Sequence, residues 1–161
     1  MTPSKSSSEV TMLLHLIDEG YHKKAWHGPN LRGSIRGITA RQALWRPGIG
    51  KHNIWEIAIH TAYWKYTVRK RLLGEQRRSF PLKGSNWFQR SGRLSEQNWR
   101  SDLMMLDEQH ASMRKAIAAL QPSELWKPLH GNAATNFTLV SGIAAHDVYH
   151  AGQIQLIKRL M

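Results

Sequence analysis

The stretch that decides the fold is Asn136–Met161, which reads NFTLVSGIAAHDVYHAGQIQLIKRLM. Its apolar residues recur every three or four positions, a spacing that places their side chains on one face of an α-helix. Two histidines fall within this apolar stripe and not on the opposite, solvent-facing side. The stripe consists of Leu139, Ile143, His146, His150, Ile154, Ile157 and Met161. We therefore expect a long helix with two imidazoles on its inner face.

The four-residue spacing of His146 and His150 stacks their side chains on neighbouring turns of that helix. Two imidazoles placed in this way can bind one metal ion from a single helix. The competing interpretation is a pair of core histidines whose ring nitrogens are hydrogen-bonded to the protein. For the pair alone both interpretations stay open, because a metal site needs a third ligand from elsewhere in the chain.

The composition indicates a single domain without disulfides. The chain has 161 residues, no cysteine and a formal net charge of +12. Without cysteine, a thiolate metal site and a cysteine nucleophile are excluded. We expect a cytoplasmic protein, because MTPSKSSSEV lacks the apolar core of a signal peptide. No apolar run reaches the roughly 20 residues of a membrane span.

The first helix is expected from Glu9 to about Trp26, after a disordered or frayed tail of residues 1–8. A kink or break is expected near Gly28–Pro29, because proline cannot donate a backbone hydrogen bond. A second piece from Asn30 to about Arg36 should follow, since Pro29 suits the first position of a helix. A capping box that begins at Thr39 predicts one further short turn.

The central helix is expected over Ile54–Leu73, between a cap at Asn53 and a terminating Gly74. Apolar residues cover most of its circumference, which is typical of a helix in the middle of a bundle. A narrow polar strip that contains Glu56 and His60 faces either the solvent or a polar pocket inside the bundle.

A third long helix is expected from its cap at Ser95 to about Leu120. The segment Gln76–Leu94 before it has no sustained period and predicts a long loop of the kind that often carries function. Together with Asn136–Met161, these helices predict an all-α four-helix bundle in one domain, residues 9–161. Because the connections are not all short, the pattern does not specify an up-down-up-down topology.

His60 is the best candidate for the third metal ligand, because it lies in the middle of the central helix. The segments KHNIWEIAIHTAYWKYTVRKRLLGE (residues 51–75) and AAHDVYHAGQIQLIKRL (144–160) resemble, in this order and separation, the DinB family of metal-binding four-helix bundles. ITARQALWRPGIG (38–50) is also similar to the family's segment before its second helix. The likeness covers nearly the whole chain, about Glu9 to Met161.

The resemblance implies that His60, His146 and His150 bind one divalent metal ion, zinc or nickel in many members, and that the protein is a homodimer. Some family members are transferases or isomerases that use a low-molecular-weight thiol, and many have no known activity. Three neutral imidazoles leave an open coordination position for a thiolate or water. The resemblance favours a thiol-dependent S-transferase. A metal-activated-water hydrolase, with Glu56 as general base, is the alternative.

The site is expected to open toward a small-molecule pocket bordered by His22–Pro29 and by the Gln76–Leu94 loop. The candidate lining residues are Trp26, His27, Trp64 and Trp87. For each tryptophan, a plain core position is the competing and favoured interpretation.

Other functions fit the sequence less well. Between Lys65 and Arg100, ten Lys or Arg face two Glu, with aromatic residues interleaved. Such a segment can bind single-stranded nucleic acid, but a basic face can also be merely solvated or attract an anionic substrate, so nucleic-acid binding is not expected. His146–His150 also reads as HDxxH, a variant of the zincin motif, but no third ligand follows His150. A bundle whose histidines bind no metal remains the structural alternative.

Overall fold

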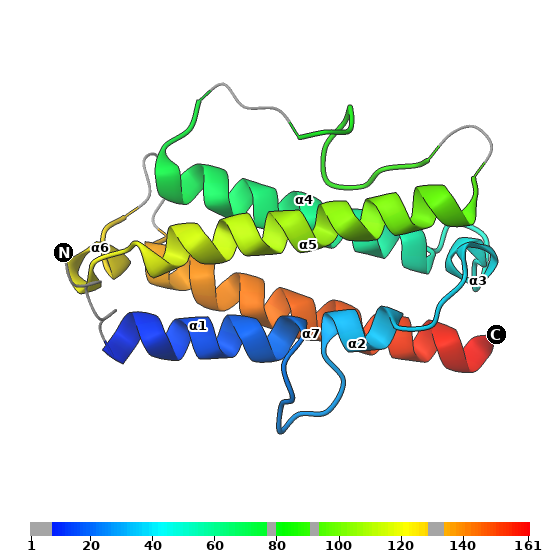
Figure 1. The fold of residues 1–161 in the computed structure, drawn as a ribbon, viewed down its shortest axis with the longest axis horizontal. Coiled ribbons are helices and arrows are strands. Elements are labelled where there is room, and N and C mark those ends of the chain that lie inside the picture. Colours follow the sequence, from blue (N-terminus) through cyan, green and yellow to red (C-terminus); the bar gives the residue numbers. More distant parts are fainter. Residues whose placement is uncertain (1–7, 77–79, 91–93, 129–133) are drawn as a thin grey trace.

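Four long helices and three short ones make up the part of the chain that the structure, a computed structural model, describes: residues 8–76, 80–90, 94–128 and 134–161. The helices are α1 (Ser8–Tyr21), α2 (Leu31–Ile35), α3 (Ala40–Leu44), α4 (Ile54–Leu73), α5 (Glu96–Ala118), α6 (Pro122–Leu125) and α7 (Asn136–Leu160). The long helices α1, α4, α5 and α7 form a bundle, and no β-strand occurs within these ranges (Figure 1). The predicted all-α bundle is therefore confirmed.

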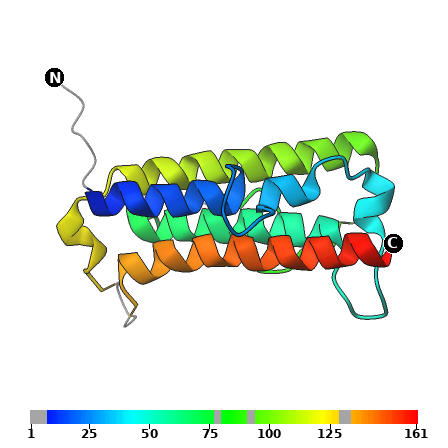
Figure 2. The same cartoon turned by 90° about the horizontal axis from the view of Figure 1, so that it is seen from below.

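The long helices run up, down, down and up, as Figures 1 and 2 show from two directions. Helices α4 and α5 run in the same direction because the connection between them returns along the bundle. Their beginnings accordingly lie together, and the rings of Trp55 and Trp99 pack with centroids 5.1 Å apart. Helix α7 is antiparallel to α4, so the middle of α7 lies beside the middle of α4.

Local sequence accounts for where most helices begin. Asn53 and Glu56 form a capping box at α4, and Thr39 and Gln42 form one at α3, both as predicted. Ser95 caps α5, because its side-chain oxygen accepts a hydrogen bond from the backbone N–H of Asn98. Helix α4 has the predicted bounds and ends at Gly74 with a left-handed backbone, φ +63°, a conformation that costs glycine little.

The first helix ends at Tyr21, earlier than the predicted Trp26. The backbone N–H groups of His22 and Lys23 both donate to the carbonyl of Asp18, at 2.9 and 2.8 Å, and this closes the helix. The side chain of Lys23 binds the Asp18 carboxylate, so local hydrogen bonding outweighs the helix propensity of the residues that follow. The break predicted near Gly28–Pro29 is therefore a loop that starts at His22.

Two smaller differences concern the ends of the predicted elements. Of the predicted tail, residues 1–8, only Ser8 lies within the described residues, and it begins α1. The short helix α6, with Pro122 at its first position, replaces part of a predicted loop. Proline suits that position because its missing N–H would have no partner there.

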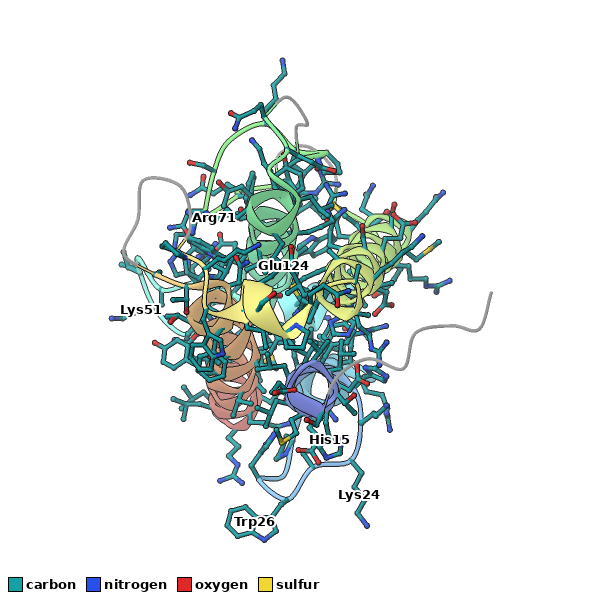
Figure 3. All side chains as sticks on the ribbon, turned by 90° about the vertical axis from the view of Figure 1, so that its left-hand side faces the viewer. His15, Lys24, Trp26, Lys51, Arg71 and Glu124 are labelled. Carbon is teal, nitrogen blue, oxygen red and sulfur yellow. The ribbon has the colours of Figure 1, made fainter. Side chains whose placement is uncertain are left out.

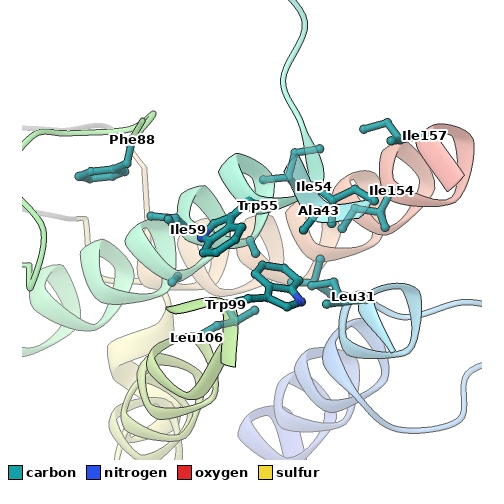
Figure 4. Close-up of a cluster of buried hydrophobic side chains, with 14 of the residues drawn as sticks. Leu31, Ala43, Ile54, Trp55, Ile59, Phe88, Trp99, Leu106, Ile154 and Ile157 are labelled. Carbon is teal, nitrogen blue, oxygen red and sulfur yellow. The ribbon is translucent and has the colours of Figure 1, made fainter. Parts of the chain in front are cut away.

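The core consists of two apolar clusters separated by buried polar residues. The first surrounds Trp55 and Trp99, with Leu31, Ile54, Ile59, Leu106, Ile154 and Ile157 among its members (Figure 4). The second contains Val10, Leu13, Ile17, Met113, Ile117, Val140 and Ile143. On α5 the buried His110 lies between Leu106 and Met113, and on α7 the buried Asp147 and His150 lie between Ile143 and Ile154. This polar layer across the bundle holds the candidate site. None of the described helices is long and apolar enough to span a membrane.

Candidate metal centre

Three histidines converge between α4 and α7. The Nε2 atom of His146 lies 3.2 Å from Nε2 of His60 and 3.1 Å from Nε2 of His150. His60 comes from the middle of α4, and the other two lie one turn apart on α7. His60 and His150 are buried, and His146 is partly buried. The structure thus brings together the three side chains that the sequence singled out.

The far side of two of the rings is fixed by hydrogen bonds. Nδ1 of His60 lies 2.9 Å from the backbone oxygen of Asn86, and Nδ1 of His150 lies 2.7 Å from Oε1 of Gln153. Both acceptors are carbonyl oxygens, so each Nδ1 must carry the hydrogen. Gln153 is held in turn, since its Nε2 donates to the Tyr149 hydroxyl at 3.0 Å. In a neutral imidazole with hydrogen on Nδ1, the Nε2 atom carries a lone pair.

This arrangement fits a bound cation better than it fits three free imidazoles. A hydrogen on Nε2 of His146 could point to His60 or to His150, but not to both. In the other of these two contacts, the Nε2 lone pairs of two histidines would then face each other about 3 Å apart, with little water to screen them. Two histidine nitrogens bound tetrahedrally to zinc at about 2.0–2.1 Å lie about 3.3 Å apart, close to the separations seen here. His60, His146 and His150 would therefore hold one divalent ion through their Nε2 atoms.

The three imidazoles are also in the right protonation state. Burial lowers the pKa of His60, and burial followed by the neighbouring histidines lowers the pKa of His146 to about 3. Burial and then the proximity of His60 lower the pKa of His150 to about 4. All three are neutral at pH 7, which is the form that binds metal.

The loop between α4 and α5 covers the cluster. The ring of Trp87 stacks on His60 with centroids 3.8 Å apart, and the ring of His52 stacks on the other side of Trp87 at 3.5 Å. Asn86, which precedes Trp87, has a left-handed backbone with φ +62°, a conformation that asparagine tolerates better than most residues. Its side-chain oxygen accepts from the Trp64 indole N–H at 2.9 Å, so the loop is tied to α4 beside the site.

A buried ion pair lies next to the cluster. Lys65 of α4 donates a hydrogen bond to the carboxylate of Asp147 on α7, and the two side chains are 0% and 1% exposed. Burial lowers the pKa of Lys65 and raises that of Asp147, while their mutual attraction opposes both shifts. Lys65 therefore binds one oxygen of the Asp147 carboxylate, and Asp147 is buried between α4 and α7.

A cavity of about 520 Å³ opens beside His150. Trp87, Gln153 and Tyr149 line it near the cluster, and apolar side chains of α7 line the part that extends toward the end of that helix. Its volume falls within the range of about 300–1,000 Å³ that is usual for small-molecule pockets. One histidine of the cluster, His150, therefore borders a space in which a small molecule fits.

Comparison with known proteins agrees with this geometry. The sequence model of the DinB superfamily matches residues 25–154, most of the chain. The chain belongs to the DinB superfamily. No curated protein and no solved structure gives a significant match.

The predicted lining residues of this DinB superfamily member divide into two groups. Trp87 lines the cavity, and Trp64 contacts the cluster edge-on, with its ring centroid 6.3 Å from those of His60 and His146. Trp26 and His27 are exposed in the loop between α1 and α2, and Trp26 points away from the bundle (Figure 3). Neither lines the cavity beside His150, so the predicted border at His22–Pro29 is not found there.

Glu56 has a structural role that the sequence indicated only in part. Its carboxylate completes the α4 capping box, pairs with both terminal nitrogens of Arg46 at 2.6 and 2.9 Å, and lies 3.0 Å from Nδ1 of His52. Burial by itself raises the pKa of Glu56, but hydrogen bonds from Arg46 and His52 lower it below its ordinary value. A carboxylate held in this way is a poor general base at neutral pH.

The structure also shows contacts that sequence reasoning missed. Asn86 and Gln153 orient two of the histidines, and no local pattern marks either residue for that role. Asp18, His22 and His110 form a second group of potential ligand atoms, on the α1–α5 side of the bundle. The neighbours of His110 in this group come from residues about 90 positions earlier in the chain, so no local pattern marks the group.

Proposed function

We propose that this DinB superfamily protein is a divalent-metal-dependent enzyme that transfers a low-molecular-weight thiol to an electrophile. The observation that supports it is the convergence of three Nε2 atoms, two of which must carry lone pairs because their Nδ1 hydrogens are committed to Asn86 and Gln153. Zinc or nickel suits three imidazole ligands. A divalent ion at such a site lowers the pKa of a thiol or water bound at its open position.

Any sulfur nucleophile must come from a small molecule, because the chain contains no cysteine. One feature of the site weighs against water as the nucleophile. Hydrolysis would gain from a free carboxylate near the cluster, but Glu56 is bound to Arg46 and Asp147 is bound to Lys65. Both carboxylates are thus committed to cations. The hydrolase is the second candidate, and it would need Glu56 to be released from Arg46 before it could act as general base.

We also propose a homodimer. Large apolar side chains are exposed on the outer faces of α1 and α7, among them Met12, Leu16, Leu156 and Leu160. Apolar side chains exposed on neighbouring helices can mark an interface. Sedimentation at micromolar concentrations gives the oligomeric state directly, and a monomer throughout that range would contradict the proposal.

Metal analysis followed by a turnover assay tests the proposed function. Protein purified without a histidine tag should contain close to one equivalent of metal. The metal-loaded protein is then incubated with an electrophile, with and without candidate thiols, and with a panel of ester, amide and phosphoester substrates. We expect turnover that needs the thiol and is lost in His150→Ala.

The control is His15→Ala, which removes an exposed histidine on α1 that pairs with Glu19, away from the site. It should keep both the metal and the activity, and so exclude adventitious binding to surface imidazoles. Hydrolysis without thiol that is lost in His150→Ala would support the second candidate instead. Turnover that is unaffected by His150→Ala would contradict both.

A further inference from the structure

The cavity beside His150 has a polar end and an apolar remainder. His150 and Gln153 are at the polar end, and the walls beyond them come from Pro47, Ile57, Leu156, Ile157 and Leu160. On α7 the lining residues recur at three- and four-residue spacing from His150 to Leu160. Ten residues of α-helix correspond to about 15 Å, so the apolar wall extends about that far from a candidate metal ligand.

The polar side chains near the cluster end of the cavity already bind other groups of the protein. Gln153 is bonded to His150 and Tyr149, and His52 is bonded to Glu56 and stacked on Trp87. Lys51 also lines the cavity, but it is exposed to solvent. A ligand in the body of the cavity therefore meets mainly apolar side chains and committed polar groups.

We propose that the substrate of this site is a small electrophile with an extended apolar body, an alkyl or aryl group, which lies along α7 while its reacting end lies at the histidine cluster. This inference rests on the proposed function for the identity of the reacting end. The apolar body follows from the cavity itself, because burying apolar surface is favourable and the walls offer few free hydrogen-bonding groups.

A series of straight-chain alkyl hydroxamates tests the proposal. The hydroxamate head binds divalent metal, and the chain is lengthened from butyl to decyl while the dissociation constant is measured by calorimetry on the zinc-loaded protein. Each added methylene should tighten binding by up to about fourfold. The gain should continue through decyl, since an extended chain advances about 1.2 Å per bond and its roughly ten bonds span about 12 Å, less than the length of the wall.

Two variants place a charge on the apolar wall. Leu156→Lys and Leu160→Lys alter half-exposed positions, 59% and 57% exposed, and leave the buried core intact. Both should reduce the gain per methylene at least twofold while the metal content stays at one equivalent. Leu73→Lys, at a 52% exposed leucine at the end of α4, is the matched control and should behave like the wild type.

The same series of alkyl chains with a carboxylate head, measured on metal-free protein, separates this inference from the proposed function. If the affinity for the carboxylates rises with chain length in the absence of metal, and metal does not change the affinity for the hydroxamates, the apolar cavity is supported and the metal enzyme is contradicted. Metal-dependent affinity that is the same from butyl to decyl overturns the inference and leaves the metal site standing. Loss of a dimer in Leu156→Lys or Leu160→Lys, without chain-length dependence in the wild type, also overturns it, because the wall would then be covered by a second copy of the chain.

Discussion

The polar layer contains two groups of potential ligands that look alike at first and differ in chemistry. On the α4–α7 side, His60, His146 and His150 present lone pairs to a common point. On the α1–α5 side, Asp18 and His110 lie within 4.8 Å of each other and of His22. Distance alone would therefore assign a metal to both groups.

Charge separates the two groups. Both carboxylate oxygens of Asp18 accept hydrogen bonds from Arg114, at 2.7 and 2.9 Å, and one of them also accepts from Lys23 at 2.8 Å. The ring of His110 stacks on Tyr21 with centroids 3.7 Å apart. Burial first, and then the charge of Lys65, lower the pKa of His110 to about 2. A cation there would meet two cationic side chains, so this second group is structural. A metal site needs free lone pairs as well as proximity.

The largest expected effect is on metal affinity, when the ring nitrogens of one histidine in each group are removed. His146→Ala should lower metal affinity by more than about 100-fold, because the loss of a direct ligand exceeds the 10- to 100-fold cost of losing an outer partner. His110→Phe keeps an aromatic ring against Tyr21 but removes both nitrogens. It should retain one equivalent of metal, measured by competition with a chromogenic chelator.

Either variant can contradict the assignment of the metal to the first group. Loss of metal in His110→Phe would make the second group the site, and full binding in His146→Ala would remove the first. Circular dichroism of both variants checks that the bundle still forms.

A second, smaller effect concerns stability and pH. Burial by itself would raise the pKa of Asp18, but hydrogen bonds from Arg114 and Lys23 lower it to about 2. A carboxylate with a lowered folded-state pKa stabilises the protein above its unfolded-state pKa of about 3.9 and loses this contribution as the pH falls toward 2. Asp18→Asn should therefore lower the free energy of unfolding by about 2 kcal/mol at pH 7.

Urea unfolding at several pH values measures this effect. The difference between Asp18→Asn and the wild type should shrink between pH 4 and pH 2, and metal content at pH 7 should be unchanged. A difference that is the same at pH 2 as at pH 7 would show that the ion pairs of Asp18 do not stabilise the fold.

The smallest expected effect is on an outer partner of the first group. Gln153→Leu removes the acceptor of the His150 Nδ1 hydrogen, so the ring loses its fixed orientation and tautomer. Metal affinity should fall by about tenfold, the low end for such a loss. Gln155→Leu is the matched control two residues further along α7, where the side chain makes only a 3.3 Å contact with Ser34. Equal losses in both variants would mean that Gln153 has no specific role in holding His150.

The sequence predicted the features that depend on local spacing. The capping boxes at Thr39 and Asn53 were legible because a short side chain is followed three residues later by Gln or Glu. His146 and His150 were recognisable because four-residue spacing puts them on one face, and His60 because it lies on a central helix. Pairings across the bundle, such as Arg114 with Asp18, could not be predicted from the sequence, because no pattern near either residue specifies its partner.

The loops were the least predictable part. Trp26 was a candidate lining residue with a plain core position as the favoured interpretation, yet it is 100% exposed. Asn86 orients His60 through its backbone oxygen, and any residue type can supply such an oxygen. Its role depends on the path of the loop, which composition alone does not determine.

The buried ion pair of Lys65 and Asp147 fixes the position of α4 along α7. Lys65 follows His60 by five residues on α4, and Asp147 directly follows His146 on α7. A shift of one helix along the other would therefore break the ion pair and, at the same time, move His60 away from His146. Replacing a buried ion pair with packed apolar residues often leaves a protein as stable or makes it more stable by about 1–4 kcal/mol. Selection of this bundle for heat resistance alone would therefore favour variants that lack the Lys65–Asp147 ion pair. The resulting protein would be as stable or more stable while the three histidines lost their common register, so thermal stability and precision of the site are separate targets in this fold.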